Sequence, residues 1–258
     1  MDWIEWLFSR EFRQFVLEHG LFVHVLFLAR FVGVTAIELI APARTISYRS
    51  VMVYDLIGCT FVGLVLVPAA EFLSSRIGLR VHVPEYIMAL PVGATFFLYY
   101  LVGDFGAYWM HRLIHLKALW RVHKWHHSPT TMYWLAGYRA SFPQLVLLHL
   151  PWIFAYSVFG LAPWWMWMAV LSSHMLLNDW QHMNVSWRSN WLEWVFVTPR
   201  YHHIHHSDNP MHHHANFGVA FSVWDRLFGT YVNPDEVKDP LSFGIGEKVP
   251  LVRLATGI

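Results

Sequence analysis

Long apolar runs separated by short polar segments dominate the hydrophobic pattern of the chain. Three of them are long enough to cross the hydrocarbon core of a bilayer, which takes about 20 residues: Leu21–Ile40, Val51–Phe72 and Tyr86–Trp109. Two shorter runs, Gln144–Gly160 and Pro163–Leu177, adjoin at a Gly-Leu-Ala-Pro turn. They predict a helical hairpin that either spans the membrane or re-enters it. The pattern therefore predicts an all-α integral membrane protein with about four to five transmembrane or re-entrant helices.

The two ends of the chain differ from these runs. Residues 2–19 mix aromatic and aliphatic side chains with charges. That pattern is typical of an amphipathic helix in the membrane interface, and a packed N-terminal helix is the alternative. From Asn178 onward the chain is polar and aromatic, so we expect this part to lie outside the bilayer or at its surface.

Composition supports a membrane protein and excludes several other classes. Of the 258 residues, 56% are hydrophobic and only 14% are charged, whereas soluble domains average about 25% charged residues. The formal net charge of +1 gives no indication of nucleic-acid binding. A single cysteine, Cys59, excludes a disulfide framework and a cysteine-based zinc site.

The segment Thr198–Asn209 is the clearest concentration of candidate chemistry. Thr198 and Pro199 are typical of a helix N-cap and first turn, and Pro210 predicts the end of that helix. Inside the segment, three histidines at i, i+3 and i+4 share one helix face. The same H-x-x-H-H spacing occurs earlier and is followed by Ser128-Pro129. These two histidine boxes consist of His202, His205 and His206, and of His123, His126 and His127.

Further histidines surround the two boxes. His111 and His115 are an i, i+4 pair at the end of the third apolar run, and His174, Asn178 and His182 form an i, i+4, i+8 row. Unpaired polar groups near lipid are costly, and neutral imidazole is a preferred ligand of iron, copper, zinc and nickel. One tetrahedral zinc takes four ligands, so nine histidines indicate two metals with four or five nitrogens each. The predicted ligands are His111, His115, His123, His126, His127, His182, His202, His205 and His206, with His174 and Asn178 as additional candidates.

Other polar residues near the boxes have predicted supporting roles. A metal-bound histidine usually donates its second ring nitrogen to a carboxylate or carbonyl. Asp104, Asp179 and Asp208 are candidates for that role, with helix capping as the alternative. His203 lies on the other face of its helix, so we do not expect it to be a ligand. His212, His213 and His214 follow Pro210 in a loop, and we expect them to be solvated or to support the ligands.

Charge distribution predicts the orientation in the membrane. All histidine clusters must meet on one side, which the hairpin allows because it returns the chain to the side it left. Thirteen Lys and Arg residues then fall on that side and four on the other, which marks the histidine side as cytoplasmic. We expect a single domain over 1–258: an interfacial helix (1–20), membrane spans (21–110), the first histidine motifs (111–142), the hairpin (143–177) and a cytoplasmic metal-binding region (178–258).

These motifs, in this order, resemble a known family. They are D-x-x-x-Y-W-x-H-R-x-x-H at Asp104–His115, H-x-x-H-H at His123–His127, Q-H-x-N at Gln181–Asn184, V-T-P-R-x-H-x-x-H-H-S-x-N at Val197–Asn209, N-F-G at Asn216–Gly218 and W-D-R-L-F-G-T-Y at Trp224–Tyr231. The pattern resembles the fatty acid hydroxylase / sterol desaturase superfamily of integral-membrane di-iron enzymes. The resemblance covers about half of the chain, residues 104–231.

The resemblance implies an O2-dependent hydroxylase with two iron ions, which zinc can replace in a purified sample. It implies two electrons from a separate ferredoxin- or cytochrome-type donor with its reductase. The expected substrate is a membrane lipid: a fatty acyl chain, an aminolipid, a sterol or a carotenoid. Desaturation at the same site remains open.

Two other classes of protein fit less well. A membrane carrier of metal or haem needs polar or histidine residues deep within the spans, and the spans contain few charged residues, among them Arg30, Glu38 and Asp55. A zinc hydrolase needs a general-base carboxylate beside the histidines, and neither H-x-x-H-H box contains one.

Overall fold

Helices form the regular structure of the chain. The computed structural model describes residues 25, 28–61, 63, 85–159, 164–238 and 240–257. Within these residues there is no β-strand, and extended segments meet only at isolated bridges such as Phe196–Phe221. This agrees with the predicted all-α class. The expected interfacial helix at 2–19 and most of the second apolar run beyond residue 61 lie outside the described residues.

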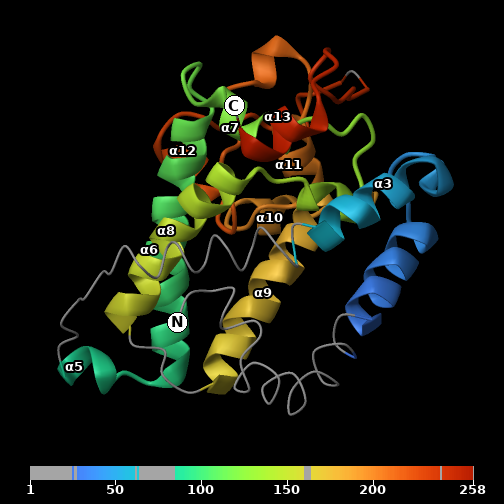
Figure 1. Ribbon diagram of the computed structural model, residues 1–258. Helices are drawn as coiled ribbons and strands as arrows, with labels where there is room; N and C mark the ends of the chain where they lie inside the picture. Colours follow the sequence, from blue (N-terminus) through green and yellow to red (C-terminus); the bar gives the residue numbers. More distant parts are fainter. Residues whose placement is uncertain are drawn as a thin grey trace.

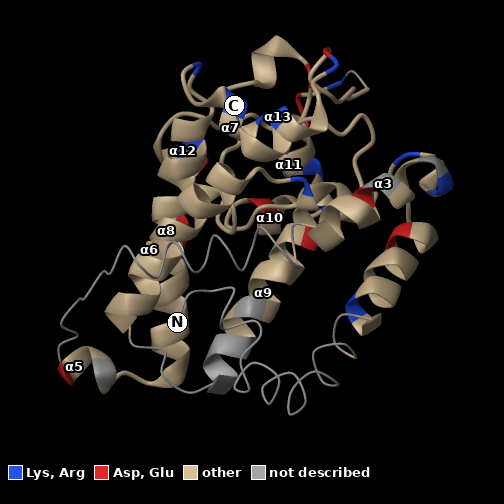
Figure 2. Ribbon diagram, in the orientation of Figure 1, with Lys and Arg blue, Asp and Glu red and all other residues tan. Residues whose placement is uncertain are grey.

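Three long helices extend to one side of a region of short helices (Figure 1). The long helices are α6 (Val92–Ile114), α8 (Phe142–Phe159) and α9 (Trp164–His182). Most charged residues lie at the end with the short helices, whereas α8 has none along its length (Figure 2). The short helices are α7 (Trp120–His123), α10 (Asn190–Glu193), α11 (Pro199–His205), η3 (Pro210–His212), α12 (Val223–Leu227) and α13 (Leu251–Thr256).

Among the described residues, α8 is the single helix that is both long and apolar enough to cross a membrane. Together with α9 it corresponds to the predicted hairpin. The break between the two helices falls at residues 160–163, outside the described part of the chain. Helix α9 continues past the predicted end at Leu177 and carries His182 as its last residue. The number of membrane spans stays a prediction.

The third apolar run, Tyr86–Trp109, is interrupted at Pro91. A short helix, α5 (Glu85–Met88), ends before this proline, and Pro91 with φ −56° and ψ 144° is the N-cap of α6. Proline lacks the backbone N–H that a continuing helix needs, so the helix restarts after it. At its other end α6 continues beyond Trp109 and places His111 in its last turn.

The N-terminal part of the described chain packs against the middle of the sequence. A helix at 28–40 and α3 (Tyr48–Phe61) adjoin a 3-10 helix, η2 (Trp134–Tyr138). Val34, Tyr133, Trp134 and Met183 belong to the buried cluster between them. This packing brings residues far apart in the sequence next to the end of α9.

The close approach of α6 and α8 depends on glycine, and this can be tested. A Cβ at Gly106 would lie 2.7 Å from the Cβ of Pro151, a ring that cannot rotate away. We expect Gly106→Ala to lower the free energy of unfolding by about 1–3 kcal/mol through overpacking. Gly93, also on α6, has nothing within 4 Å of its Cβ position, so Gly93→Ala should leave it unchanged or slightly higher. Thermal unfolding in detergent measures both, and equal midpoints for the two variants would contradict this packing.

Candidate metal centre

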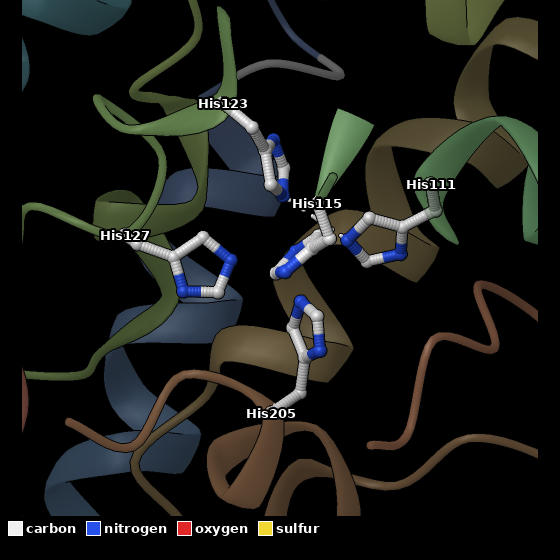
Figure 3. Close-up of side chains that lie close together, drawn as sticks. All are labelled: His111, His115, His123, His127 and His205. Atoms are coloured by element: carbon white, nitrogen blue, oxygen red, sulfur yellow. Dashed lines mark hydrogen bonds between the residues drawn. The ribbon is translucent and has the colours of Figure 1, made fainter. Parts of the chain in front are cut away.

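Five histidines from three separate parts of the sequence meet in one buried group, which we call the first cluster. His111 and His115 come from the end of α6, His123 from α7, His127 from the turn after it and His205 from α11. Each offers one ring nitrogen, and these nitrogens lie within 4.8 Å of one another. Figure 3 shows the five rings converging on a common centre.

Four further histidines form a second cluster beside the first. It consists of His126, His182, His202 and His206, whose ring nitrogens also lie within 4.8 Å of one another. The Nε2 atom of His182 lies 3.3 Å from that of His126 and 3.2 Å from that of His206. The clusters adjoin, because the rings of His127 and His206 stack with centroids 4.4 Å apart. All nine predicted ligands thus lie in these two clusters, five in one and four in the other.

The short helix α11 delivers three of these rings. Thr198 has the extended backbone of an N-cap, and Pro199 is the first helical residue, as predicted. The Thr198 hydroxyl donates to Glu193 at 2.6 Å and makes no cap hydrogen bond within the helix. The helix ends with His205, earlier than the predicted stop before Pro210. Of its three rings, that of His205 belongs to the first cluster and those of His202 and His206 to the second.

Backbone carbonyls fix the orientation of five of the rings. Nδ1 of His111 lies 2.8 Å from the carbonyl oxygen of Phe217, and Nδ1 of His205 lies 2.9 Å from that of Ala215. A carbonyl only accepts hydrogen bonds, so each of these Nδ1 atoms carries the proton and its Nε2 keeps a free lone pair. The remaining pairs are His115 with the carbonyl of His213, His126 with that of Arg139 and His182 with that of Asn178.

The nitrogens left over fit metal ions. In the described part of the chain, Nε2 of His115, His127 and His205 is buried without a hydrogen-bond partner. Orphaned buried nitrogens are costly, and a cation bound by these lone pairs would satisfy them together. In the second cluster, four Nε2 atoms face one another. Two of them can form a hydrogen bond only if one carries a proton, so the four cannot all be paired with one another. The donor set contains imidazole alone, which suits iron, zinc or copper.

The loop that supplies two of the carbonyls is held by two buried aspartates. Asp225 accepts the N–H groups of Phe217 and Gly218, each at 2.7 Å. Asp104 accepts those of Ala220 and Phe221 at 2.7 and 2.9 Å. Between the two acceptor carbonyls lies Asn216, the single described non-glycine residue with positive φ, 57°. Sequence reasoning noted the N-F-G motif without assigning this role, which depends on a turn that only the fold reveals.

The three aspartates predicted to orient imidazoles contact other groups. Asp104 holds the loop described above, and Asp179 pairs with Arg30 at 2.8 Å. Asp208 accepts a hydrogen bond from the Ser242 hydroxyl at 2.6 Å. Main-chain carbonyls take the predicted role at five of the nine rings.

The two additional ligand candidates lie outside both clusters. His174, two turns before His182 on α9, packs against Tyr99, Tyr100 and Trp152. Asn178 contributes its backbone carbonyl to His182. A row at i, i+4, i+8 follows one face of a helix, and only its last member reaches the second cluster.

The other histidines near the boxes are also outside the clusters. His203 receives hydrogen bonds from the Arg44 guanidinium, which lies 3.1 Å from Nδ1, and its Nε2 faces the carbonyl of His182 at 3.3 Å. Arg44 was not considered as a partner, since nothing local links it to residue 203. The chain between Pro210 and Ala215 lies across the first cluster, where the backbone of His213 contacts His115.

An open cavity of about 490 Å³ reaches the first cluster. His115, His127 and His205 line its inner part together with His206 of the second cluster. Trp120 and Ile245 add apolar surface, while Lys117, Asp208, His213 and His214 are also among the lining residues. The cavity is therefore lined by residues of both clusters.

Burial keeps these imidazoles uncharged. It lowers the pKa of His123, His127 and His205 well below the ordinary value of 6.5, and neighbouring imidazoles lower it further. The pKa values of His126, His202 and His206 are lowered for the same reasons. The rings are thus in the neutral form that binds metal at neutral pH.

We expect the metal-free protein to lose stability on acidification. The pKa of each of these rings is lower in the folded than in the unfolded state, so unfolding takes up protons below about pH 6.5. Each ring then lowers the free energy of unfolding by up to about 1.4 kcal/mol per pH unit, until the pH reaches the pKa of that ring in the folded state. Thermal unfolding after chelation should show a clearly lower midpoint at about pH 5.5 than at about pH 7.5. An unchanged midpoint would contradict burial of neutral rings.

Comparison with known proteins places this site in a family. The family model for fatty acid hydroxylase matches residues 96–230. The chain is 32% identical to alkylglycerol monooxygenase of Xenopus tropicalis over 55% of this chain and 31% of that protein. It is 33% identical to ornithine lipid hydroxylase OlsE of Rhizobium tropici over 57% of this chain and 43% of the relative, and 28% identical to human lathosterol oxidase over 62% and 52%.

The matches to the first two relatives thus span less than half of their length. No solved structure matches the chain. The family model covers more than half of the chain and includes both histidine boxes, and the resemblance noted in the sequence is confirmed. The chain belongs to the fatty acid hydroxylase family.

Proposed function

We propose that this chain is an O2-dependent membrane-lipid hydroxylase with two irons. The reaction inserts one oxygen atom into an unactivated C–H bond. One O2, two electrons and two protons are consumed, and the hydroxylated lipid and one water are formed. The electrons come from a separate ferredoxin- or cytochrome-type donor with its reductase.

The adjoining clusters of five and four neutral imidazoles are the observation that carries this proposal. Consecutive residues tie the clusters together: His126 and His206 belong to the second, His127 and His205 to the first. Each site is an all-nitrogen donor set of the size expected for one metal. Bound iron would supply the activation of O2 that no side chain provides.

The protein's own residues orient the ligands and keep water out. Carbonyl acceptors hold five rings in one tautomer, which directs their Nε2 lone pairs inward. All nine rings are at most 7% exposed, so the reacting centre is shielded from bulk water apart from the cavity. A shielded site limits loss of a strong oxidant to side reactions.

The substrate class follows from the cavity and the relatives. The relatives' names refer to alkylglycerol, an ornithine lipid and sterols, which supports a lipid. The cavity joins apolar walls to polar residues at Lys117 and Asp208, as an amphiphile needs. A fatty acyl chain, an aminolipid, a sterol and a carotenoid remain the candidates, reached from a multi-pass membrane domain whose metal side faces the cytoplasm.

The decisive experiment counts metals and follows lipid mass. The full chain, purified in detergent, should bind two irons, and after addition of Fe(II), a reductant and O2 a co-purified lipid should gain one oxygen atom. His205→Ala should lower this activity at least about 100-fold, because even partners of metal ligands contribute 10–100-fold. His149→Ala is the matched control, since His149 lies outside both clusters and bonds the carbonyl of Leu145.

The possible outcomes separate the related reactions. Loss of two hydrogens without a gain of oxygen would identify a desaturase that uses the same site. Binding of one metal ion or none per chain, together with no oxygen consumption, would refute the di-iron proposal.

A further inference from the structure

Three charged residues in the N-terminal helices have no part in the function proposed above. They are Arg30 and Glu38 on the helix at 28–40 and Asp55 on α3, all before the region that the family model matches. Glu38 and Asp55 are 0% and 2% exposed. Buried charges are expensive unless they are paired, so their partners indicate what they support.

We propose that Asp55 and Glu38 are positioning residues for the second cluster, and that binding of the second metal depends on them. This inference rests on the proposed function in requiring two metals. It assigns a structural role at the metal centre to the N-terminal helices. That role is to hold η2 and its flanking residues against His126 and His182.

Asp55 acts on His126 through one intervening residue. Its carboxylate accepts hydrogen bonds from Nε of Arg139 at 2.6 Å and from the hydroxyl of Tyr133 at 2.5 Å. The backbone carbonyl of Arg139 lies 3.1 Å from Nδ1 of His126. Arg139 also donates to the Ser128 hydroxyl at 3.1 Å, beside the first histidine box. The carboxylate thus fixes the residue whose carbonyl sets the His126 tautomer.

Glu38 acts on the segment around His182. One of its oxygens, Oε1, accepts the N–H of Trp134 at 2.8 Å and the N–H of Asn184 at 2.7 Å. Trp134 begins η2, and Asn184 follows His182 by two residues. A single carboxylate oxygen therefore joins η2 to the end of α9.

Gly137 shows how closely η2 approaches the metal ligand. A Cβ at Gly137 would overlap the His182 ring. Arg30 adds a further connection, because it pairs with Asp179, and Asp179 accepts a hydrogen bond from the Tyr138 hydroxyl at 2.7 Å. Movement of η2 towards His182 would therefore displace the imidazole.

The first cluster has a separate support. The carbonyl acceptors for its rings belong to His213, Ala215 and Phe217. Asp104 and Asp225 hold the loop that follows. Among the described residues, no hydrogen bond links Glu38 or Asp55 to that loop. Loss of either N-terminal carboxylate should consequently weaken the second metal site much more than the first.

Glu38 allows a matched pair of substitutions. Glu38→Gln keeps an oxygen that can accept both N–H groups, whereas Glu38→Met keeps the size and loses the acceptor. Asp55→Asn removes the charge that pairs with Arg139. We expect Glu38→Met and Asp55→Asn to weaken binding of the second Zn²⁺ about 10- to 100-fold, the usual effect of losing a group that orients a ligand, and Glu38→Gln to retain it.

Site-resolved titration tests this in the full chain. Zn²⁺ binding is measured in chelator-buffered solution, with bound metal counted by native mass spectrometry. In a His205→Ala background, which disables the first cluster, Asp55→Asn should weaken the remaining site. In a His202→Ala background, which disables the second, it should change the remaining affinity less than about 3-fold, well below the expected effect.

Gly106→Ala serves as the control for a general loss of stability, and it should bind two Zn²⁺. Equal weakening of both sites by Asp55→Asn, or full retention of two metals by both Glu38→Met and Asp55→Asn, would overturn the inference. If Asp55→Asn does not fold, the comparison of Glu38→Gln with Glu38→Met tests the inference instead. Equal binding of the second Zn²⁺ by these two variants would overturn it. Failure of the unaltered chain to bind two metals would instead refute the proposed function.

Discussion

Nine imidazoles packed together in the interior create a hydrogen-bonding constraint on which the rest of the fold depends. A neutral ring has one N–H donor and one lone pair, and rings that face one another cannot all pair. The fold gives five rings an external acceptor for Nδ1–H and leaves their Nε2 atoms for the centre. Four of those acceptors lie outside the long helices, and the fifth, Asn178, belongs to α9, so the irregular segments must be as rigid as the helices.

Two supports of different origin provide that rigidity. On one side, Asp104 and Asp225 bind successive backbone N–H groups and fix the turn around Asn216. On the other, carboxylates from the N-terminal helices bind Arg139 and the N–H groups of Trp134 and Asn184. The long helices α6 and α9 mainly deliver histidines at their ends. The immediate surroundings of the rings are built from irregular segments.

The sequence could predict the parts of the site that follow from local spacing. His202 and His205 lie on one short helix with Thr198 at its N-cap, and His206 is its C-cap. The break at Pro91 does not follow from the hydrophobic pattern, because apolar residues continue on both sides of the proline. His174 was a reasonable ligand candidate by periodicity, yet it lies among aromatic rings on α9.

The residues that orient the histidine rings could not be predicted from local spacing, because the contacts are long-range. The carbonyls that orient His111 and His115 lie 106 and 98 positions away along the chain. A backbone carbonyl acceptor cannot be recognised from the sequence, because every residue has one. The carboxylates of Asp104 and Asp225 are visible in the sequence, but their backbone partners are not, because the N–H groups that they accept belong to residues of any type.

His213 illustrates what main-chain orientation of ligands makes possible. Its carbonyl accepts from His115, and the residue, with its imidazole side chain, is among those that line the cavity. Replacing that side chain reshapes the cavity and keeps the carbonyl, whereas inserting one residue into the loop would shift the carbonyl itself. Substrate preference in such a loop can evolve by point substitution while the reactive centre is inherited unaltered, provided that loop length is preserved.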